Sequence, residues 1–250
     1  MLKLERRTEW KCPEANDARI LTMPNLPRPC HGAGMQPRTI YGRVAWDKTR
    51  KRCYVKANFK CEACGADVSA SGAAQAHELF DIDYEAGTST YVRCACLCKN
   101  CHILTIHNGR ALTLFKQGNP LYRAEVLLKA AESSFKAVHD WNVAHPGETP
   151  LKMYATFTEY LKEPELAAGM QDLIAKYHIK FWVEDKKKFA DWGRWKVIVN
   201  GKDYPTPYAS YDDWVTAMQK ESLNDPERQV SNPFSGGVYD EVKEFLKGEK

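Results

Sequence analysis

Two Cys-x-x-Cys pairs constrain the fold of this 250-residue chain more than any other feature of its sequence. The first pair is Cys61 and Cys64, and the second is Cys98 and Cys101, with residues 65–97 between them. Each pair bends the backbone so that two thiolates point the same way, and four thiolates complete the tetrahedral shell that Zn²⁺ prefers. The pairing of two such motifs predicts a zinc ion rather than reduced core cysteines or a redox pair. Because a full shell leaves no open position, we expect this ion to be structural.

The number of cysteines and the N-terminal residues indicate the cellular compartment. The chain has nine cysteines, an odd number, and its first residues, MLKLERRTEW, contain no apolar signal core. We therefore expect a cytoplasmic protein with metal-binding cysteines rather than disulfides. Cys94 and Cys96 alternate with Cys98 along one predicted strand face, where they either pack as small buried hydrophobes or compete for the metal. No apolar run reaches the roughly 20 residues of a membrane helix, so no membrane partner is expected.

The patterning predicts an α+β fold in three parts. We expect an N-terminal arm at residues 1–45, a zinc-stapled domain at 46–146, and a small α+β module at 147–250 that is a candidate for substrate binding. Apolar periodicity and capping residues predict these elements in the first two parts: a strand at Arg19–Met23, a helix at Trp46–Phe59, strands at Ala73–Ile82 and Tyr91–Leu97, a helix at His102–Asn108, and a long helix at Leu121–His145.

The C-terminal module is predicted from weaker signals. Its expected elements are helices at Leu151–Leu161 and Pro164–Tyr177, strands at Ile179–Glu184 and Arg194–Val199, a hairpin turn at Asn200-Gly201, a helix from Ser210 to Glu221, and a last helix at Tyr239–Lys247. Aromatic residues interleave with lysines and arginines over residues 179–214. This pattern fits either contact with nucleic acid or a small hairpin core with a charged rim.

We call the turns formed by the two Cys-x-x-Cys pairs the first and the second knuckle. A histidine-bearing strand is predicted between them, and more histidines follow the second knuckle. Residues 76–83 read AHELFDID, and the second knuckle runs on through His102 to His107. Together with the knuckles, this order resembles the HNH endonucleases of the ββα-metal fold, and most closely a branch found in phages. The resemblance covers about residues 27–110. It implies a zinc-stapled ββα-metal core and a protein that acts on DNA inside a bacterial host.

The resemblance also implies roles for individual residues. His77 matches the general base, and an imidazole with a pKa near 6.5 suits deprotonation of water at neutral pH. His102 and His107 match the helix-borne ligands of a catalytic divalent cation, Mg²⁺ or another, which stabilises the leaving oxygen. Glu78 is a further candidate for the catalytic centre. The implied reaction is metal-dependent hydrolysis of DNA phosphodiester bonds.

Three departures from the family pattern keep other functions open. Ala76 stands where many HNH sequences have Asp or His, so Glu78, Asp81 or Asp83 would have to replace that ligand. No asparagine occurs near residues 88–90, where the family has its middle residue. The step from His102 to His107 places them roughly 140° apart on an ideal helix, so a shared metal requires a π-bulge, and otherwise only His102 binds it. The alternatives are a catalytically inactive zinc-stapled module that binds DNA or protein as a regulator or inhibitor, and an RNA or nucleotide hydrolase.

Basic residues cluster in the predicted helix before the first knuckle. The chain carries a net charge of only +4, but Arg50, Lys51, Arg52 and Lys56 lie close together. Such a cluster can neutralise DNA phosphates, and it can equally be the solvated face of a helix. We expect these four residues to contact nucleic acid.

Overall fold

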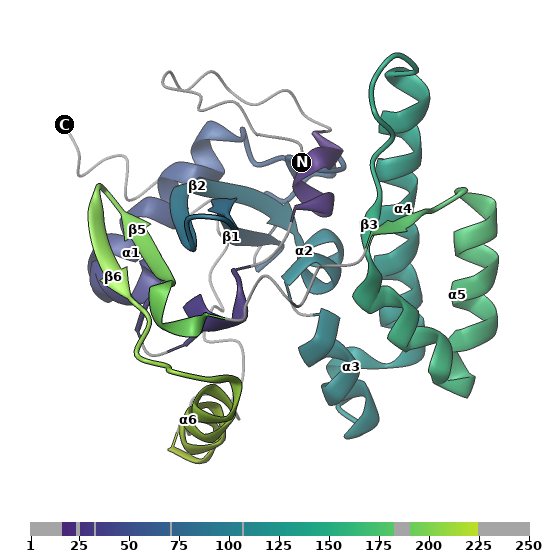
Figure 1. Cartoon of the computed structure of the whole chain (residues 1–250). Coiled ribbons are helices and arrows are strands. Elements are labelled where there is room, and N and C mark those ends of the chain that lie inside the picture. The colour runs from purple at the N-terminus through teal and green to yellow at the C-terminus, as the bar shows by residue number, and fades with distance from the viewer. Residues whose placement is uncertain are drawn as a thin grey trace.

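A mixed four-stranded sheet forms the centre of the protein, with strand order β1-β2-β5-β6 and helices around it (Figure 1). The computed structural model describes residues 17–23, 26–32, 34–70, 72–106, 108–182 and 191–224. Helices and strands both occur along these residues, which confirms the predicted α+β class. The helix predicted at Tyr239–Lys247 lies outside the described residues. Among the helices described, none is long and apolar enough to cross a membrane.

The two strands predicted between the knuckles are confirmed as an antiparallel hairpin. β1 (Ala74–Asp83) pairs with β2 (Thr88–Cys98), and the register places His77 opposite Ala95 and Glu78 opposite Cys94. Helix α2 (Lys99–Ile106) starts at the residue after β2. The chain therefore runs strand, strand, helix without a loop before the helix. In Figure 1, α1 and α2 lie on either side of this hairpin.

Helix α1 (Pro37–Lys56) extends further towards the N-terminus than the predicted helix, which began at Trp46. Pro37 occupies the first turn, where its missing amide hydrogen costs no hydrogen bond. Gly42 has a φ of 73°, which glycine adopts without strain, and it kinks the helix. This kink interrupts the apolar periodicity, which is why sequence patterning detected only the second part of the helix.

The C-terminal strands join the sheet of the β1–β2 hairpin instead of forming a sheet of their own. β5 (Lys196–Val199) pairs in parallel with β2, from Thr88 opposite Lys196 to Thr90 opposite Ile198. β6 (Lys202–Pro205) follows through Asn200-Gly201, where both residues have positive φ, as the predicted tight hairpin turn requires. The sheet therefore contains strands from both sides of the boundary predicted at residues 146/147.

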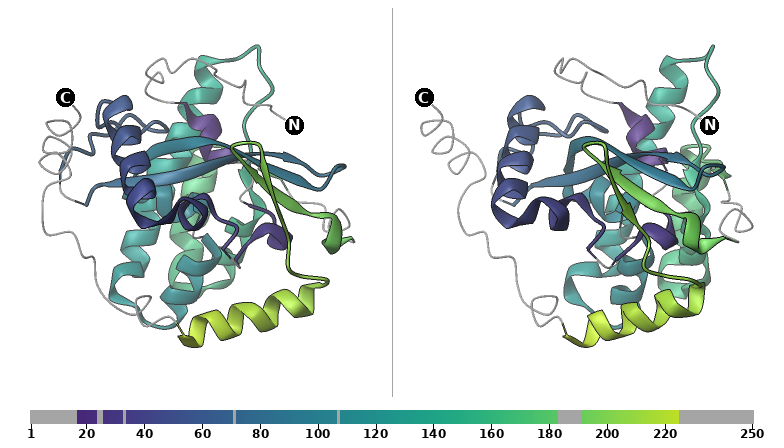
Figure 2. Two further views of the ribbon diagram at one scale, coloured as in Figure 1. Left: turned by 90° about the vertical axis from the view of Figure 1, so that its left-hand side faces the viewer. Right: turned by 60° about the vertical axis from the view of Figure 1, so that its left-hand side comes forward.

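Most of the helices lie where the sequence predicts them. The long helix is confirmed as α4 (Ala124–Ala144), which packs on α2 and on α5 (Pro164–Lys176). Helix α6 (Tyr211–Asn224) begins after Ser210, whose Oγ accepts a hydrogen bond from the Asp213 amide. Figure 2 shows α6 apart from the sheet, at the foot of the molecule. The helix predicted across His102–Asn108 is divided, because α2 ends at Ile106 and α3 (Asn108–Lys116) starts two residues later.

Two predicted elements were wrong in type. The segment predicted as a strand at Arg19–Met23 is a 3₁₀-helix, η1 (Ala18–Thr22), because the Asp17 side chain caps it by accepting from the Arg19 amide. The predicted helix at Leu151–Leu161 is a short strand, β3 (Met153–Tyr154), followed by a 3₁₀-helix, η4 (Ala155–Lys162). β3 pairs in parallel with β4 (Phe181–Trp182), and this distant partner is invisible to local patterning.

Apolar side chains gather in two clusters. The larger one joins the β1–β2 hairpin to α2, α4 and α5, and Leu97, Leu104 and Phe135 in it are fully buried. The smaller one packs Phe80 and Ile82 of β1 against Trp195 of the C-terminal segment. Trp192, Trp195 and Tyr208 are buried, which confirms the hairpin-core interpretation for these aromatic residues.

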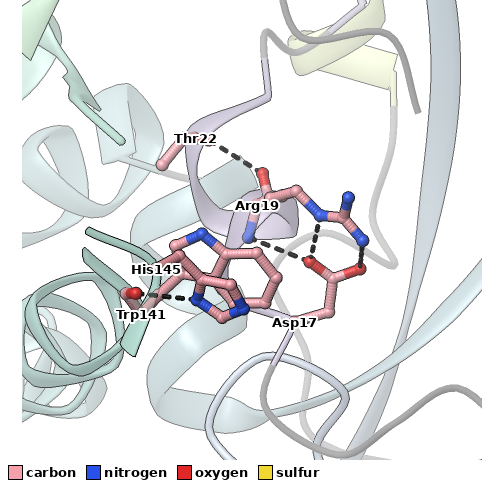
Figure 3. A network of polar contacts seen from close by, with 5 residues as sticks. All are labelled: Asp17, Arg19, Thr22, Trp141 and His145. Carbon is pink, nitrogen blue, oxygen red and sulfur yellow. Dashed lines mark hydrogen bonds and ion pairs between the residues drawn. The ribbon is translucent and has the colours of Figure 1, made fainter. Parts of the chain in front are cut away.

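A polar and aromatic network fastens η1 to the C-terminal end of α4 (Figure 3). The Asp17 carboxylate accepts from Nε and Nη2 of Arg19 at 2.7 and 2.8 Å. The Arg19 guanidinium lies 5.0 Å from the ring centroid of Trp141, a cation–π contact. The imidazole of His145 stacks on the same indole, with ring centroids 3.9 Å apart. Within the predicted N-terminal arm, η1 is thus anchored on the long helix.

Replacing Asp17 tests this anchor. Asp17→Ala removes both the cap of η1 and the partner of Arg19, so the free energy of unfolding should fall by about 1–2 kcal/mol. Asp17→Asn keeps an oxygen acceptor and should lose roughly half as much. Urea denaturation of the two variants measures the effect. A loss of less than about 0.3 kcal/mol in the alanine variant would show that the network does not stabilise the fold.

Candidate metal centre and imidazole pair

The four knuckle cysteines converge on one point. Their Sγ atoms all lie within 4.8 Å of one another, and those of Cys64 and Cys98 are 3.8 Å apart. Zinc–sulfur bonds of about 2.3 Å in a tetrahedral shell place sulfur atoms roughly 3.8 Å apart. Cys61 and Cys101 are buried, whereas Cys64 and Cys98 are partly exposed. The predicted ligand set is therefore brought together in an arrangement that fits a zinc ion.

Backbone hydrogen bonds shape the two knuckles. The Cys61 amide donates to the Ala66 carbonyl, and the Gly65 amide donates back to the Cys61 carbonyl, both at 2.8 Å. In the second knuckle the Cys101 amide donates to Sγ of Cys98 at 3.4 Å. Hydrogen bonds, the strongest from the Cys101 thiol, hold the pKa of the Cys98 thiol far below its ordinary value. Since the thiolate is the metal-binding form, this lowering favours coordination by Cys98, whereas hydrogen bonds to the other three cysteines raise the pKa of the Cys101 thiol.

The remaining cysteines of β2 do not belong to the cluster. Cys94 and Cys96 are buried, with 3% and 0% of their surface exposed. Cys94 contacts Cys53 of α1, on the face of the sheet that α1 covers. These two cysteines pack as small hydrophobic side chains, as the first of the two interpretations held.

Glu62, inside the first knuckle, is a residue of the site that sequence reasoning missed. Only 1% of its surface is exposed, and its carboxylate forms an ion pair with Nη1 of Arg93 at 2.7 Å. Its Oε1 also accepts from the Cys96 amide at 2.8 Å. Burial raises the pKa of the Glu62 carboxyl, and Arg93 opposes this rise. A glutamate in a polar knuckle looks like a surface charge, so no local signal marked it.

The structure brings His77 and His102 together. His77, on β1, is 8% exposed, and His102 lies in the first turns of α2. Their ring centroids are 6.1 Å apart and their planes meet at 89°. His102 directly follows Cys101, so the cysteine cluster fixes the start of α2 relative to the hairpin that carries His77. His107, the third predicted histidine, lies outside the described residues.

The structure does not bring Glu78 to the imidazole pair. Neighbouring residues of a strand point to opposite faces, and Glu78 faces α1, where its Oε1 accepts from the Arg38 amide at 3.3 Å. Burial raises the pKa of the Glu78 carboxyl, and the Arg38 charge opposes this rise. Asp83 is engaged in the hairpin turn, where its Oδ1 accepts from the amides of Glu85 and Ala86.

The predicted basic cluster divides into two sets on α1. Arg50 and Lys51 are half-buried and bind Asp47, with Nε of Arg50 and Nζ of Lys51 at 2.7 and 2.9 Å from its carboxylate. Arg52 and Lys56 are exposed, and so is Lys48. These three exposed residues recur every fourth position and therefore form one stripe along the helix, the α1 stripe.

Comparisons with known proteins found no match among protein-family models, among curated proteins or among solved structures.

Removing one ligand tests the metal centre. Cys98→Ser should reduce bound zinc from one equivalent to near zero, measured by elemental analysis. A ligand present at about a thousandfold its dissociation constant stabilises a fold by about 4 kcal/mol. At this chain length, that loss lowers the melting temperature by roughly 8–16 °C. Cys94→Ala, a buried cysteine outside the cluster, is the matched control and should keep its zinc. Equal zinc content in the two variants would contradict the ligand set.

Proposed function

We propose that the protein is a metal-dependent endonuclease of the HNH type that hydrolyses phosphodiester bonds of DNA. One observation carries the proposal: the rings of His77 and His102 lie 6.1 Å apart, His77 on β1 and His102 on α2, the helix that carries Cys101 of the cysteine cluster. The HNH-like order of motifs in residues 61–107 supports the same function.

The proposed chemistry divides the work between the two imidazoles. His77 accepts a proton from water while the water oxygen bonds to phosphorus, and the bond from phosphorus to the leaving sugar oxygen breaks. A divalent cation would supply a positive charge that stabilises the leaving oxygen. His102 is the described residue that would hold this cation. The cysteine cluster cannot supply that chemistry, since four thiolates leave no open position on zinc.

The α1 stripe supports DNA as the partner. Successive cations of the stripe, Lys48, Arg52 and Lys56, are about 6 Å apart along the helix axis. Such a row can follow a phosphate backbone and adds affinity without reading sequence. Because α1 covers the face of the sheet opposite the imidazole pair, the stripe would hold backbone outside the cleavage site.

The proposal predicts metal-dependent cleavage that requires His77. His77→Ala should nick supercoiled plasmid at least about 100-fold more slowly than the wild type in Mg²⁺, Mn²⁺ or Ni²⁺, because positioned general bases contribute roughly 10²–10⁴-fold. His139→Gln is the matched control: this histidine lies on α4, where its Nδ1 is hydrogen-bonded to the Tyr177 carbonyl. Equal cleavage by wild type and His77→Ala would remove His77 from the mechanism.

Ala76 favours a second candidate, a catalytically inactive module that binds DNA or protein, because the family's acidic or histidine ligand is absent there. Binding of duplex DNA without cleavage in any of these metals would establish that candidate. Faster cleavage of RNA than of DNA would instead indicate an RNA hydrolase.

The α1 stripe predicts a salt effect on binding. Without added divalent cations, the triple variant Lys48→Gln, Arg52→Gln, Lys56→Gln should reduce the steepness of log affinity against log salt by about 2–3, roughly one unit per lost phosphate contact. Fluorescence anisotropy with a labelled duplex measures this slope. The control removes three exposed lysines that pair with carboxylates elsewhere, namely Lys136, Lys162 and Lys176. Equal slopes for the two triple variants would exclude the stripe as a DNA contact.

A further inference from the structure

The burial of Glu62 requires a physical explanation. A carboxylate is costly to remove from water unless it is paired and hydrogen-bonded, and 1% of this residue is exposed. In sequence Glu62 also lies between two cysteines of the cluster, Cys61 and Cys64, and a thiolate at the neighbouring Cys61 would add negative charge. A neutral residue would avoid this cost, so the contacts of Glu62 indicate what the charge does.

Glu62 completes the outer edge of β2. Near the start of β2, the residues Thr88–Thr90 pair with β5 on that edge. Near its end, Cys96 exchanges two hydrogen bonds with Glu62: the Glu62 amide donates to the Cys96 carbonyl, and the Glu62 carboxylate accepts from the Cys96 amide, both at 2.8 Å. The carboxylate thus takes the place of a strand carbonyl.

The other polar groups of Glu62 are also engaged. Arg93, which pairs with the carboxylate at 2.7 Å, donates from Nη1 to the Cys94 carbonyl at 3.1 Å, so its guanidinium is held on β2. The Glu62 carbonyl accepts from the Asp17 amide at 2.7 Å, and this bond attaches η1 to the knuckle. Glu62 therefore joins three segments: the first knuckle, β2 and the N-terminal 3₁₀-helix.

We propose that Glu62 is the positioning residue of the metal centre. Cys98 lies two residues beyond Cys96 on the same strand, about 6.6 Å away. Cys61 precedes Glu62 directly. The paired bonds between Glu62 and Cys96 therefore set where the first knuckle meets the second, and Arg93 fixes the orientation of the carboxylate. Replacing residues that orient metal ligands typically costs 10–100-fold in metal affinity.

Zinc release tests this role directly. Purified Glu62→Ala should transfer its zinc to a chromogenic chelator at least tenfold faster than the wild type. Glu62→Gln keeps an oxygen for the Cys96 amide but loses the charge that pairs with Arg93, so its rate should fall between the two. Substitution with Co²⁺ adds a spectroscopic measurement, because the thiolate–cobalt absorption bands report the geometry of the shell. These bands should shift in Glu62→Ala.

Leu127→Ala is the matched control for general destabilisation. Leu127 is fully buried on α4, and its truncation should lower the melting temperature while the cobalt bands stay unchanged. Wild-type release and unshifted bands in Glu62→Ala would overturn the proposal. If Glu62→Ala does not fold, wild-type release from Glu62→Gln would overturn it equally. These measurements use neither DNA nor cleavage, so their outcome is independent of the proposed nuclease function.

Discussion

The convergence of four thiols is the interaction on which the rest of this structure depends. It joins the turn after α1 to the junction of β2 and α2, and so it closes residues 61–101 into one unit. Because Cys98 ends the strand and Cys101 lies in the first turn of the helix, the cluster sets the angle at which α2 leaves the sheet. The position of His102, and hence its approach to His77 on the paired strand, follows from that angle.

The cluster does not act alone, because a two-stranded hairpin is only marginally stable by itself and needs further strands or helices packed against it. Three distant segments complete the unit. The β5–β6 hairpin extends the sheet along the first residues of β2, Thr88–Thr90, and α4 covers α2 with buried side chains such as Leu127 and Phe135. The 3₁₀-helix η1 attaches to the knuckle through Glu62 and to α4 through Arg19. The contacts of Glu62 and Arg19 thus set how these segments are placed relative to one another, whereas apolar packing supplies most of the stability.

What could be predicted from the sequence was local. The cysteine spacing, the alternation in β1 and β2, the periodicity of α4 and the Asn200-Gly201 turn each depend on a few adjacent residues, and all four features are present. The parallel pairing of β2 with β5 joins segments about a hundred residues apart, and no local pattern encodes it. The ion pair of Glu62 with Arg93 was missed for the same reason. The opposite placement of His77 and Glu78, by contrast, follows from strand alternation and was available from the sequence.

X-ray absorption at the zinc edge, on protein loaded with one equivalent of zinc, tests the central claim most directly. Four sulfur scatterers at about 2.3 Å are the result that the thiol cluster predicts. A shell that contains nitrogen or oxygen at about 2.0–2.1 Å in place of sulfur would contradict it. In that case the junction between β2 and α2 would not be held by the four cysteines, and the approach of His102 to His77 would need another cause.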